Sequence, residues 1–266
     1  MLRFLYATAP GRLMLKFLTT RGVSRVAGKF MDSRASRTLI GPFIRKNGID
    51  LSEYVPARYA SFNEFFTRRV RPECRPIDFA PDALIAPCDG RLSAYRITDQ
   101  SEFRIKNSVY SVQTLLGNDP RASLFRGGTC LVFRLCVDDY HRYHFFDDCT
   151  IEPSRFIPGV LHTVRPIALE HTDVFHQNCR EATFLHTAHF GLAAQIEVGA
   201  MLVGRICNHP PRPNIHRGDE KGCFLYGGST VVLLLLPNAA RFPESLFTDT
   251  ARDIETRAKM GQKLSI

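Results

Sequence analysis

The chain has 266 residues, of which 44% are hydrophobic and 23% are charged, and its formal net charge is +9. A chain of this size and composition is expected to be globular, with one sizeable core or two modest ones. Its longest apolar run, Val231 to Pro237, is much shorter than the roughly 20 residues that a membrane-spanning helix needs. The sequence therefore excludes a helical membrane span.

The positive charge is concentrated near the N-terminus. Residues 1–50 contain ten Lys or Arg and two Asp, a net charge of +8, whereas the remaining 216 residues are nearly neutral. This imbalance predicts an anionic partner, and a membrane surface and nucleic acid are the two candidates. We expect no nucleic acid, because the later basic residues are dispersed and no aromatic platform motif of single-strand binders occurs in the sequence.

Residues 11–34 are predicted to form two short amphipathic helices with a break at Gly22. Arg21, Arg25 and Lys29 keep the i, i+4 spacing that stacks charge along one side of a helix. A cation-rich, acid-poor amphipathic helix suits the headgroup layer of an anionic membrane. Two other interpretations stay open: helices that pack their apolar side on the protein core, and an organellar transit peptide of similar composition.

Residues 35–80 are predicted to contain more helix and a Pro-containing loop, including a short helix with Ser61 and Glu64 at capping-box spacing. From Pro81 onward strand-like segments follow one another, and one short helix is predicted at 112–116. The predicted strands are 83–86, 91–97, 103–105, 129–136, 144–146, 159–164, 182–187, 191–198 and 231–236. The sequence therefore predicts an α+β fold, with a β-rich catalytic body and a helical, basic N-terminal region.

Eight cysteines are scattered along the chain without a Cys-x-x-Cys pair, and no secretory signal precedes them. This pattern favours reduced thiols in a cytosolic compartment over a disulfide framework or a zinc ribbon.

Three short motifs carry candidate chemistry. Asp89 lies in a Pro/Gly turn, His141 and His144 follow an apolar strand, and Ser229 stands between Gly228 and a buried-strand pattern. An Asp, a His and a Ser are the parts of an orienting acid, a base and a nucleophile. Read alone, each motif also fits an ordinary turn or core residue, and the sequence does not show whether they meet.

The histidines also fit a metal site. His141 and His144 share the His-x-x-His spacing with His186 and His189, and such pairs can hold zinc together with a carboxylate. We disfavour metal because no Glu lies within either pair and no Cys pair completes a site. A zinc hydrolase that uses His141, His144 and His186, and a noncatalytic β-rich module that binds acidic membranes, remain alternatives.

A set of motifs occurs in a fixed order over about residues 60–236. It includes Phe62-Asn63-Glu64-Phe65-Phe66-Thr67-Arg68, Arg75-Pro76-Ile77, Pro87-x-Asp89-Gly90, Asp139-Tyr140-His141-Arg142-Tyr143-His144, Gly159-x-Leu161-x-Thr163-Val164, Val203-Gly204, Lys221-Gly222-x-Phe224 and Gly227-Gly228-Ser229-Thr230. In these motifs the chain resembles the phosphatidylserine decarboxylase proenzymes, a family of self-processing pyruvoyl enzymes. It departs from the family pattern at Asn107, where Gly is usual, and at Cys88, where a small or β-branched residue is usual.

The resemblance implies that the chain cuts itself between Gly228 and Ser229, which gives a β chain of residues 1–228 and an α chain of residues 229–266. His144, oriented by Asp89, would take the Ser229 proton so that Oγ attacks Gly228. The implied cofactor is a covalent pyruvoyl group formed from Ser229, with no metal.

The implied reaction converts phosphatidylserine into phosphatidylethanolamine and CO2 through a Schiff base between the pyruvoyl carbonyl and the serine amine, with the pyruvoyl group as electron sink. His141 would handle the substrate carboxylate region or reprotonate the product, and its division of roles with His144 stays open.

The expected domains are a helical membrane-associating region at 1–60 and a pyruvoyl-dependent decarboxylase domain at 61–266. We expect a peripheral membrane protein on the cytoplasmic face of the cell membrane, bound to anionic phospholipid, with a homodimer left open. The near alternative is a related pyruvoyl decarboxylase that acts on another serine lipid or on a free amino acid.

Overall fold

The structure is a computed structural model that describes residues 2–100, 102–105, 108–162, 174–200, 205–210, 212–226 and 229–266. Several motif residues lie outside the described residues: Asn107, Thr163, Val164, Val203, Gly204, Gly227 and the predicted cleavage residue Gly228.

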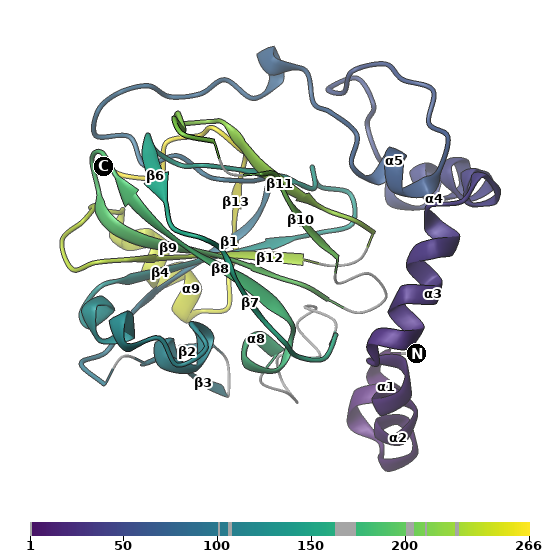
Figure 1. Ribbon diagram of the computed structural model, residues 1–266, viewed down its shortest axis with the longest axis horizontal. Helices are drawn as coiled ribbons and strands as arrows, with labels where there is room; N and C mark the ends of the chain where they lie inside the picture. Colours follow the sequence, from purple (N-terminus) through teal and green to yellow (C-terminus); the bar gives the residue numbers. More distant parts are fainter. Residues whose placement is uncertain are drawn as a thin grey trace.

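An eight-stranded antiparallel sheet forms the centre of the body (Figure 1). Its order is β13-β1-β4-β12-β9-β8-β6, and β7 also pairs with β8. The strands are β1 (Gly90–Arg96), β4 (Thr129–Leu135), β6 (Cys149–Ile151), β7 (Arg155–Ile157), β8 (Arg180–Thr187), β9 (Gly191–Val198), β12 (Ser229–Leu235) and β13 (Thr256–Ala258). β12 pairs with β4 on one side and β9 on the other, and all seven of its residues are buried.

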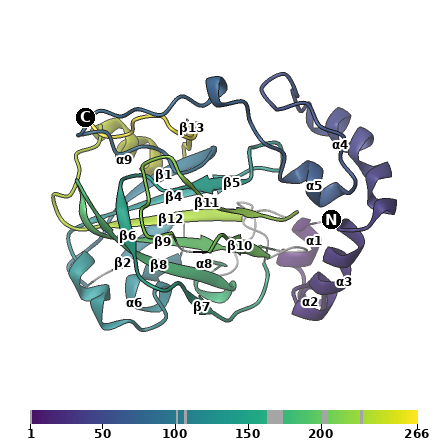
Figure 2. The same cartoon turned by 45° about the horizontal axis from the view of Figure 1, so that its top comes forward.

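The two faces of this sheet are covered by different elements (Figure 2). On one face, Val232 and Leu234 join a core with α6 (Val112–Leu115), η3 (Pro120–Phe125), α8 (Val174–Gln177) and the two-stranded sheet of β2 (Glu102–Ile105) and β3 (Ser108–Ser111). On the other face, Val231, Leu233 and Leu235 pack with α9 (Glu244–Ala251) and with a three-stranded sheet. That sheet has the order β10 (Ile206–Asn208), β11 (Glu220–Phe224), β5 (Arg142–His144).

Helices form the N-terminal part, and α1 to α5 stand beside the body in Figure 1. They are α1 (Leu2–Ala7), α2 (Ala9–Leu18), α3 (Arg21–Met31), η1 (Arg34–Leu39), α4 (Ile40–Asn47), α5 (Phe62–Phe66) and η2 (Pro72–Cys74). The α+β fold class with a β-rich body is therefore confirmed. In the part of the chain that the structure describes, no helix has the length and apolar character needed to cross a membrane.

The N-terminal helices divide their apolar residues between core and surface. Leu5 and Leu15 are buried in the core of the body, whereas Leu13 and Val26 are 72% and 71% exposed. The predicted break at Gly22 is wrong by a few residues, because Gly22 lies in the first turn of α3 and the chain bends at Thr19 and Thr20. Part of the helical surface is thus left without a partner within the described chain.

The predicted strands at 91–97, 103–105, 129–136, 182–187, 191–198 and 231–236 correspond to strands of the structure. Residues 83–86 are buried but contribute only an isolated bridge at Ile85, and residues 159–162 contribute only one at Val160. The third strand of the small sheet is 142–144 rather than 144–146, because Phe145 and Phe146 are buried in the core without ladder pairing. In these places an apolar sequence pattern therefore predicted strands where the structure has chain with little or no ladder pairing.

Candidate active site

Ser229 begins the central strand β12, opposite Leu135 of β4. Side chains alternate along a strand, so Ser229 shares the face of Val231, which packs in the core beneath the three-stranded sheet. Its side chain is buried, and Oγ has no hydrogen-bond partner within the described residues. A buried hydroxyl without a partner is uncommon in a folded protein and calls for an explanation. The hydroxyl is available for chemistry.

The two predicted histidines are both buried and each has a free ring nitrogen. His141 is 0% exposed; its Nδ1 lies 2.9 Å from the Asp139 carbonyl oxygen. Its Nε2, like Nδ1 of His144, has no hydrogen-bond partner among the described residues. Each imidazole therefore presents a nitrogen that could accept a proton.

Burial sets the protonation state of these histidines. Burial, with the positive charge of Arg68, lowers the pKa of His141 to about 3. Burial also lowers the pKa of His144 to about 4, although the carboxylate of Glu220, opposite His144 across β5 and β11, acts in the other direction. Both imidazoles are neutral at pH 7, and a neutral imidazole is the form that acts as a base.

Asp89 is held firmly, but by a partner other than His144. Arg75 donates two hydrogen bonds to its carboxylate, of 2.8 Å to Oδ1 and 2.6 Å to Oδ2, and the Met260 backbone N–H donates a third. Glu53 accepts from the same guanidinium. The backbone brings the segments together, because His144 N–H donates to the Pro87 carbonyl two residues before Asp89.

The segment before Ser229 is fixed by the motif helix α5. Phe224 N–H donates to the His141 carbonyl, and Tyr226 N–H donates to Oδ1 of Asn63. The Tyr226 ring packs edge-on against Phe62 and Phe66, with centroids 4.9 and 5.3 Å apart. Phe66 also lies 4.0 Å, centroid to centroid, from His141. A continuous set of contacts thus joins α5, His141 and Tyr226, which lies three residues before Ser229.

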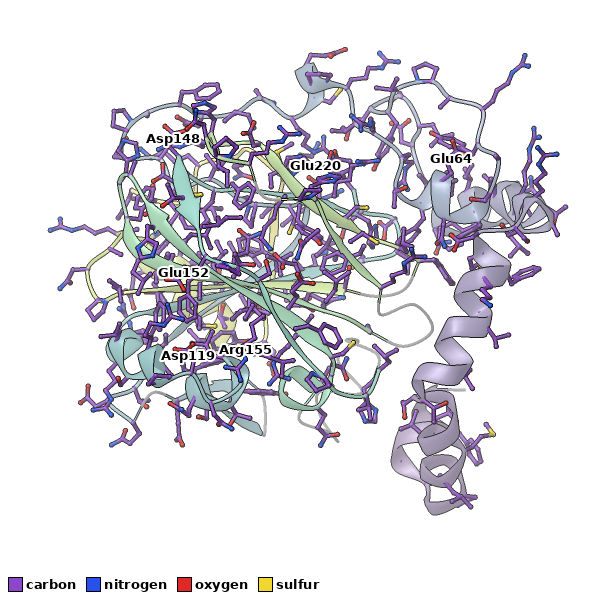
Figure 3. All side chains as sticks on the ribbon, in the orientation of Figure 1. Glu64, Asp119, Asp148, Glu152, Arg155 and Glu220 are labelled. Carbon is purple, nitrogen blue, oxygen red and sulfur yellow. The ribbon has the colours of Figure 1, made fainter. Side chains whose placement is uncertain are left out.

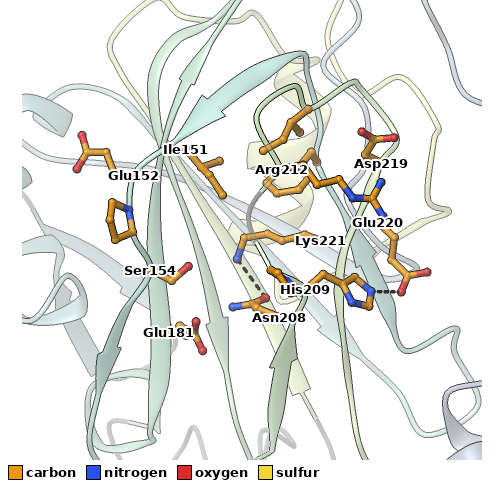
Figure 4. A pocket seen from close by; sticks show the side chains of 14 residues that line it. Ile151, Glu152, Ser154, Glu181, Asn208, His209, Arg212, Asp219, Glu220 and Lys221 are labelled. Atoms are coloured by element: carbon orange, nitrogen blue, oxygen red, sulfur yellow. Dashed lines mark hydrogen bonds and ion pairs between the residues drawn. The ribbon is translucent and has the colours of Figure 1, made fainter.

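A buried ion pair lies between the two sheets on the Ser229 face. Lys221 Nζ donates a 2.6 Å hydrogen bond to Glu197, the residue opposite Val231, and burial raises the pKa of Glu197. Lys221 also lines a hollow of about 500 Å³ between β11 and the β6 side of the body (Figure 4). Glu152 lies on one wall of this hollow and Glu220, bonded to His209, on the other.

The alternative zinc site is not assembled. The His186 imidazole is mostly exposed and contacts Glu152 on the β6 side, and His189 bonds the buried Asp147. His186 bonds Glu152, whereas His144 lies opposite Glu220 in the ladder of β5 and β11. These two carboxylates line opposite walls of the hollow and are well separated in Figure 3, so the two histidines do not come together. Among the described residues, no group of three or more His, Cys, Asp or Glu could hold a metal ion.

Sequence reasoning assigned no role to Arg75, Asn63, Glu197 or Lys221. Arg75, Asn63 and Lys221 belong to the matched motifs, and membership in a motif was the only indication in the sequence that they have a role. Their partners lie 14 to 163 residues away in the chain, as in the pairs Arg75–Asp89 and Asn63–Tyr226. Local patterns carry no information about such pairs.

Comparison with known proteins gives one consistent result. The family model described as phosphatidylserine decarboxylase matches residues 62–265. The chain is 43% identical to phosphatidylserine decarboxylase proenzyme 2 of Clostridium acetobutylicum, over 99% of this chain and 90% of that protein. It is 39% identical to the phosphatidylserine decarboxylase proenzyme of Chlamydia pneumoniae, over 98% and 89% of the two chains. The corresponding protein of Desulfitobacterium hafniense (strain Y51) is 38% identical, over 100% and 91%.

Proposed function

Because the chain belongs to the phosphatidylserine decarboxylase family, we propose that it processes itself and then converts phosphatidylserine into phosphatidylethanolamine and CO2. The observation that carries the proposal is the buried Oγ of Ser229, which has no hydrogen-bond partner among the described residues, in a protein whose two motif histidines are neutral. A reactive serine fits this position better than a structural one, because a structural hydroxyl would be hydrogen-bonded.

In the proposed self-cleavage, His144 takes the proton of Ser229 while Oγ attacks the carbonyl of Gly228, and the peptide bond becomes an ester. Loss of the Cα proton of residue 229 and cleavage of its Cβ–O bond then free the carboxylate of Gly228 and leave a dehydroalanine. Hydrolysis of the resulting enamine consumes one water and releases ammonia, which leaves a pyruvoyl group at position 229. A positioned base is typically worth on the order of 10² to 10⁴ in rate.

Asp89 has a positioning role in this proposal. Arg75 and the Met260 N–H fix its carboxylate, and the Pro87 carbonyl fixes the His144 backbone, so both residues are held on one rigid framework. Such a framework keeps the base in a single orientation, as catalytic geometry requires.

The pyruvoyl group supplies a carbonyl that acts as an electron sink when a carboxylate leaves as CO2. His141 is the proposed residue for the substrate carboxylate region or for the proton that replaces CO2. Its Nε2 is free for this role within the described chain, while Nδ1 is occupied by the Asp139 carbonyl.

Membrane binding is proposed for the N-terminal helices, as expected for an enzyme whose substrate stays in the bilayer. Phe4, Leu13, Met14, Val26 and Phe30 are 47 to 72% exposed on α1 to α3. Arg34 and Arg37 of η1, together with Arg58, line a hollow and form no ion pair within the described residues. Exposed apolar side chains and unpaired cations in one helical region suit the headgroup layer of an anionic membrane, here the cytoplasmic face.

Denaturing mass spectrometry of the purified protein tests the first step. We expect two chains, residues 1–228 and 229–266, with a pyruvoyl end on the shorter one, and a single uncut chain of about 30.1 kDa for Ser229→Ala. An uncut wild-type chain that is folded would overturn the proposal.

The substrate is tested by release of CO2 from carboxyl-labelled compounds. We expect release from phosphatidylserine vesicles and little from free serine. Faster release from free serine or from another serine lipid would identify the near alternative instead.

A further inference from the structure

Two cysteines lie directly opposite each other on neighbouring strands. Cys207 of β10 is the register partner of Cys223 of β11, and both are half-buried. Residues paired in this way in an antiparallel ladder have Cα atoms about 4.5 to 5.5 Å apart. Disulfides span Cα distances of about 4.4 to 6.8 Å, so the backbone already has a spacing that a disulfide accepts.

The surroundings of this thiol pair are those of reactive cysteines. Arg142 is the other register partner of Cys223, and Arg205 and His209 lie two residues on either side of Cys207. Two acids offset part of this charge, because Asp32 pairs with Arg205, and Glu220 pairs with Arg142 and His209. Reactive thiols typically occupy partly exposed positions next to positive charges.

Each thiol also affects the ionisation of the other. A hydrogen bond between them, with the charge of Arg205, lowers the pKa of Cys207, and the same hydrogen bond raises the pKa of Cys223. One thiolate is therefore stabilised beside one thiol. The buried Cys88 and Cys130 differ, because burial raises the pKa of both.

We propose that Cys207 and Cys223 form a reversible disulfide when the protein meets a two-electron oxidant such as hydrogen peroxide. The Cys207 thiolate attacks one peroxide oxygen and becomes a sulfenic acid, and water leaves. Cys223 sulfur then attacks the sulfenic sulfur, a second water leaves, and the S–S bond forms. The two thiols lose two electrons and two protons, and the peroxide is reduced to two waters.

The proposal does not depend on the decarboxylase activity. Self-cleavage at Gly228 would leave both cysteines in the same chain, so the crosslink is intramolecular before and after processing. Its location matters because β11 is the strand that leads into the cleavage segment.

Peptide mapping of the whole protein tests the pair directly. The protein is treated with hydrogen peroxide, denatured, blocked with N-ethylmaleimide and digested with trypsin without reduction. We expect peptide 206–217 linked to the peptide that begins at Gly222, two fewer blocked thiols than the eight of the untreated chain, and reversal by dithiothreitol. At pH 7 we expect alkylation of Cys207 to be on the order of tenfold faster than that of half-buried Cys74.

Variants separate this pair from general thiol oxidation. Cys207→Ser should lose the crosslink, and the matched control Cys74→Ser should keep it, each with a native circular dichroism spectrum. If a variant fails to fold, the peptide map of the wild-type protein still shows whether Cys207 and Cys223 are linked. A map in which oxidised Cys207 and Cys223 remain unlinked, or are linked to other cysteines or other molecules, would overturn the proposal.

Discussion

The charged side chains of the body and of the N-terminal helices differ in burial and in pairing. In the body, Asp89 is bonded to Arg75 and Glu197 to Lys221, and all four side chains are almost fully buried. In the N-terminal region, Arg34 and Arg37 are exposed without an ion pair among the described residues. Paired, buried charge fixes geometry, whereas exposed, unpaired charge attracts a partner. This difference supports the proposals that the chemistry takes place in the body and that the helices bind the membrane.

The two regions are nevertheless connected. Asn63 of α5 bonds Asp32 at the end of α3 through its amide nitrogen and the Tyr226 backbone through its oxygen. The helices proposed to bind the membrane are thereby tied to Tyr226, shortly before Ser229.

The largest expected effects come from the buried chemistry. We predict that His144→Ala slows self-cleavage by about 10² to 10⁴, because the base is lost, and that Asp89→Asn slows it as well. The measurement is the fraction of cut chain against time by mass spectrometry. His186→Ala, an exposed histidine, is the control and should process normally; normal processing of Asp89→Asn would remove Asp89 from the mechanism.

The buried ion pair should be the next most sensitive feature. We expect Lys221→Met to lower the free energy of unfolding by about 3–5 kcal/mol, because Glu197 keeps an unpaired charge in the interior. Urea denaturation measures this. The matched control Arg96→Met breaks a pair whose side chains are 66% and 68% exposed and should cost less than about 1 kcal/mol. An equal loss of unfolding free energy in both variants would mean that an ion pair contributes no more to stability in the interior than at the surface.

Charge reversal tests the helical region. The triple variant Arg34→Glu, Arg37→Glu, Arg58→Glu should weaken binding to phosphatidylserine vesicles by on the order of 100-fold or more, since each basic residue near such a surface contributes about 1 kcal/mol. Co-sedimentation with vesicles measures it. Arg241→Glu, Arg252→Glu, Arg257→Glu changes the same amount of charge at exposed body positions and should bind nearly normally. Equal weakening by both would indicate a response to net charge alone.

Acid should lower the stability of the fold through the two buried histidines. Their folded pKa values, about 3 for His141 and about 4 for His144, lie below the ordinary 6.5. The unfolded chain therefore binds more protons between about pH 4 and 6.5. Their contribution to stability is complete above about pH 6.5 and is lost as the pH falls through that window, by at most about 1.4 kcal/mol per pH unit for each histidine.

Urea denaturation at pH 7, 6 and 5 measures this slope. His141→Gln should reduce it, while His216→Gln, at a side chain that is 74% exposed, should leave it unchanged. The same slope in His141→Gln and wild type would contradict a buried neutral His141.

The parts of the fold that the sequence predicted are those set by local pattern. The run from Val231 predicted the fully buried strand β12, and Ser61 caps α5 through the predicted bond from Glu64 N–H. The small sheet was largely missed, because β10 and β5 have three residues each and β11 contains Gly222 and a register shift. Such strands are too short and too polar to show a period of two.

In the candidate site, too, local motifs identified residues, but their contacts became visible only in the structure. Asp89, His141, His144 and Ser229 were named from motifs, and their catalytic roles stay predictions. The sequence could not indicate that Arg75 holds Asp89, because that contact depends on how a Pro-containing loop folds back on the sheet. Burial of both imidazoles, which keeps them neutral, is likewise a property of the packed structure.

The central place of β12 in the sheet determines whether the two products of cleavage stay together. If the bond before Ser229 is cut as proposed, the short product keeps its strand hydrogen-bonded between β4 and β9, with α9 and β13 attached to β1 and its neighbours. It cannot leave without opening the sheet. Fragments of two molecules would therefore not be traded, and the mature enzyme would keep the two chains of a single precursor.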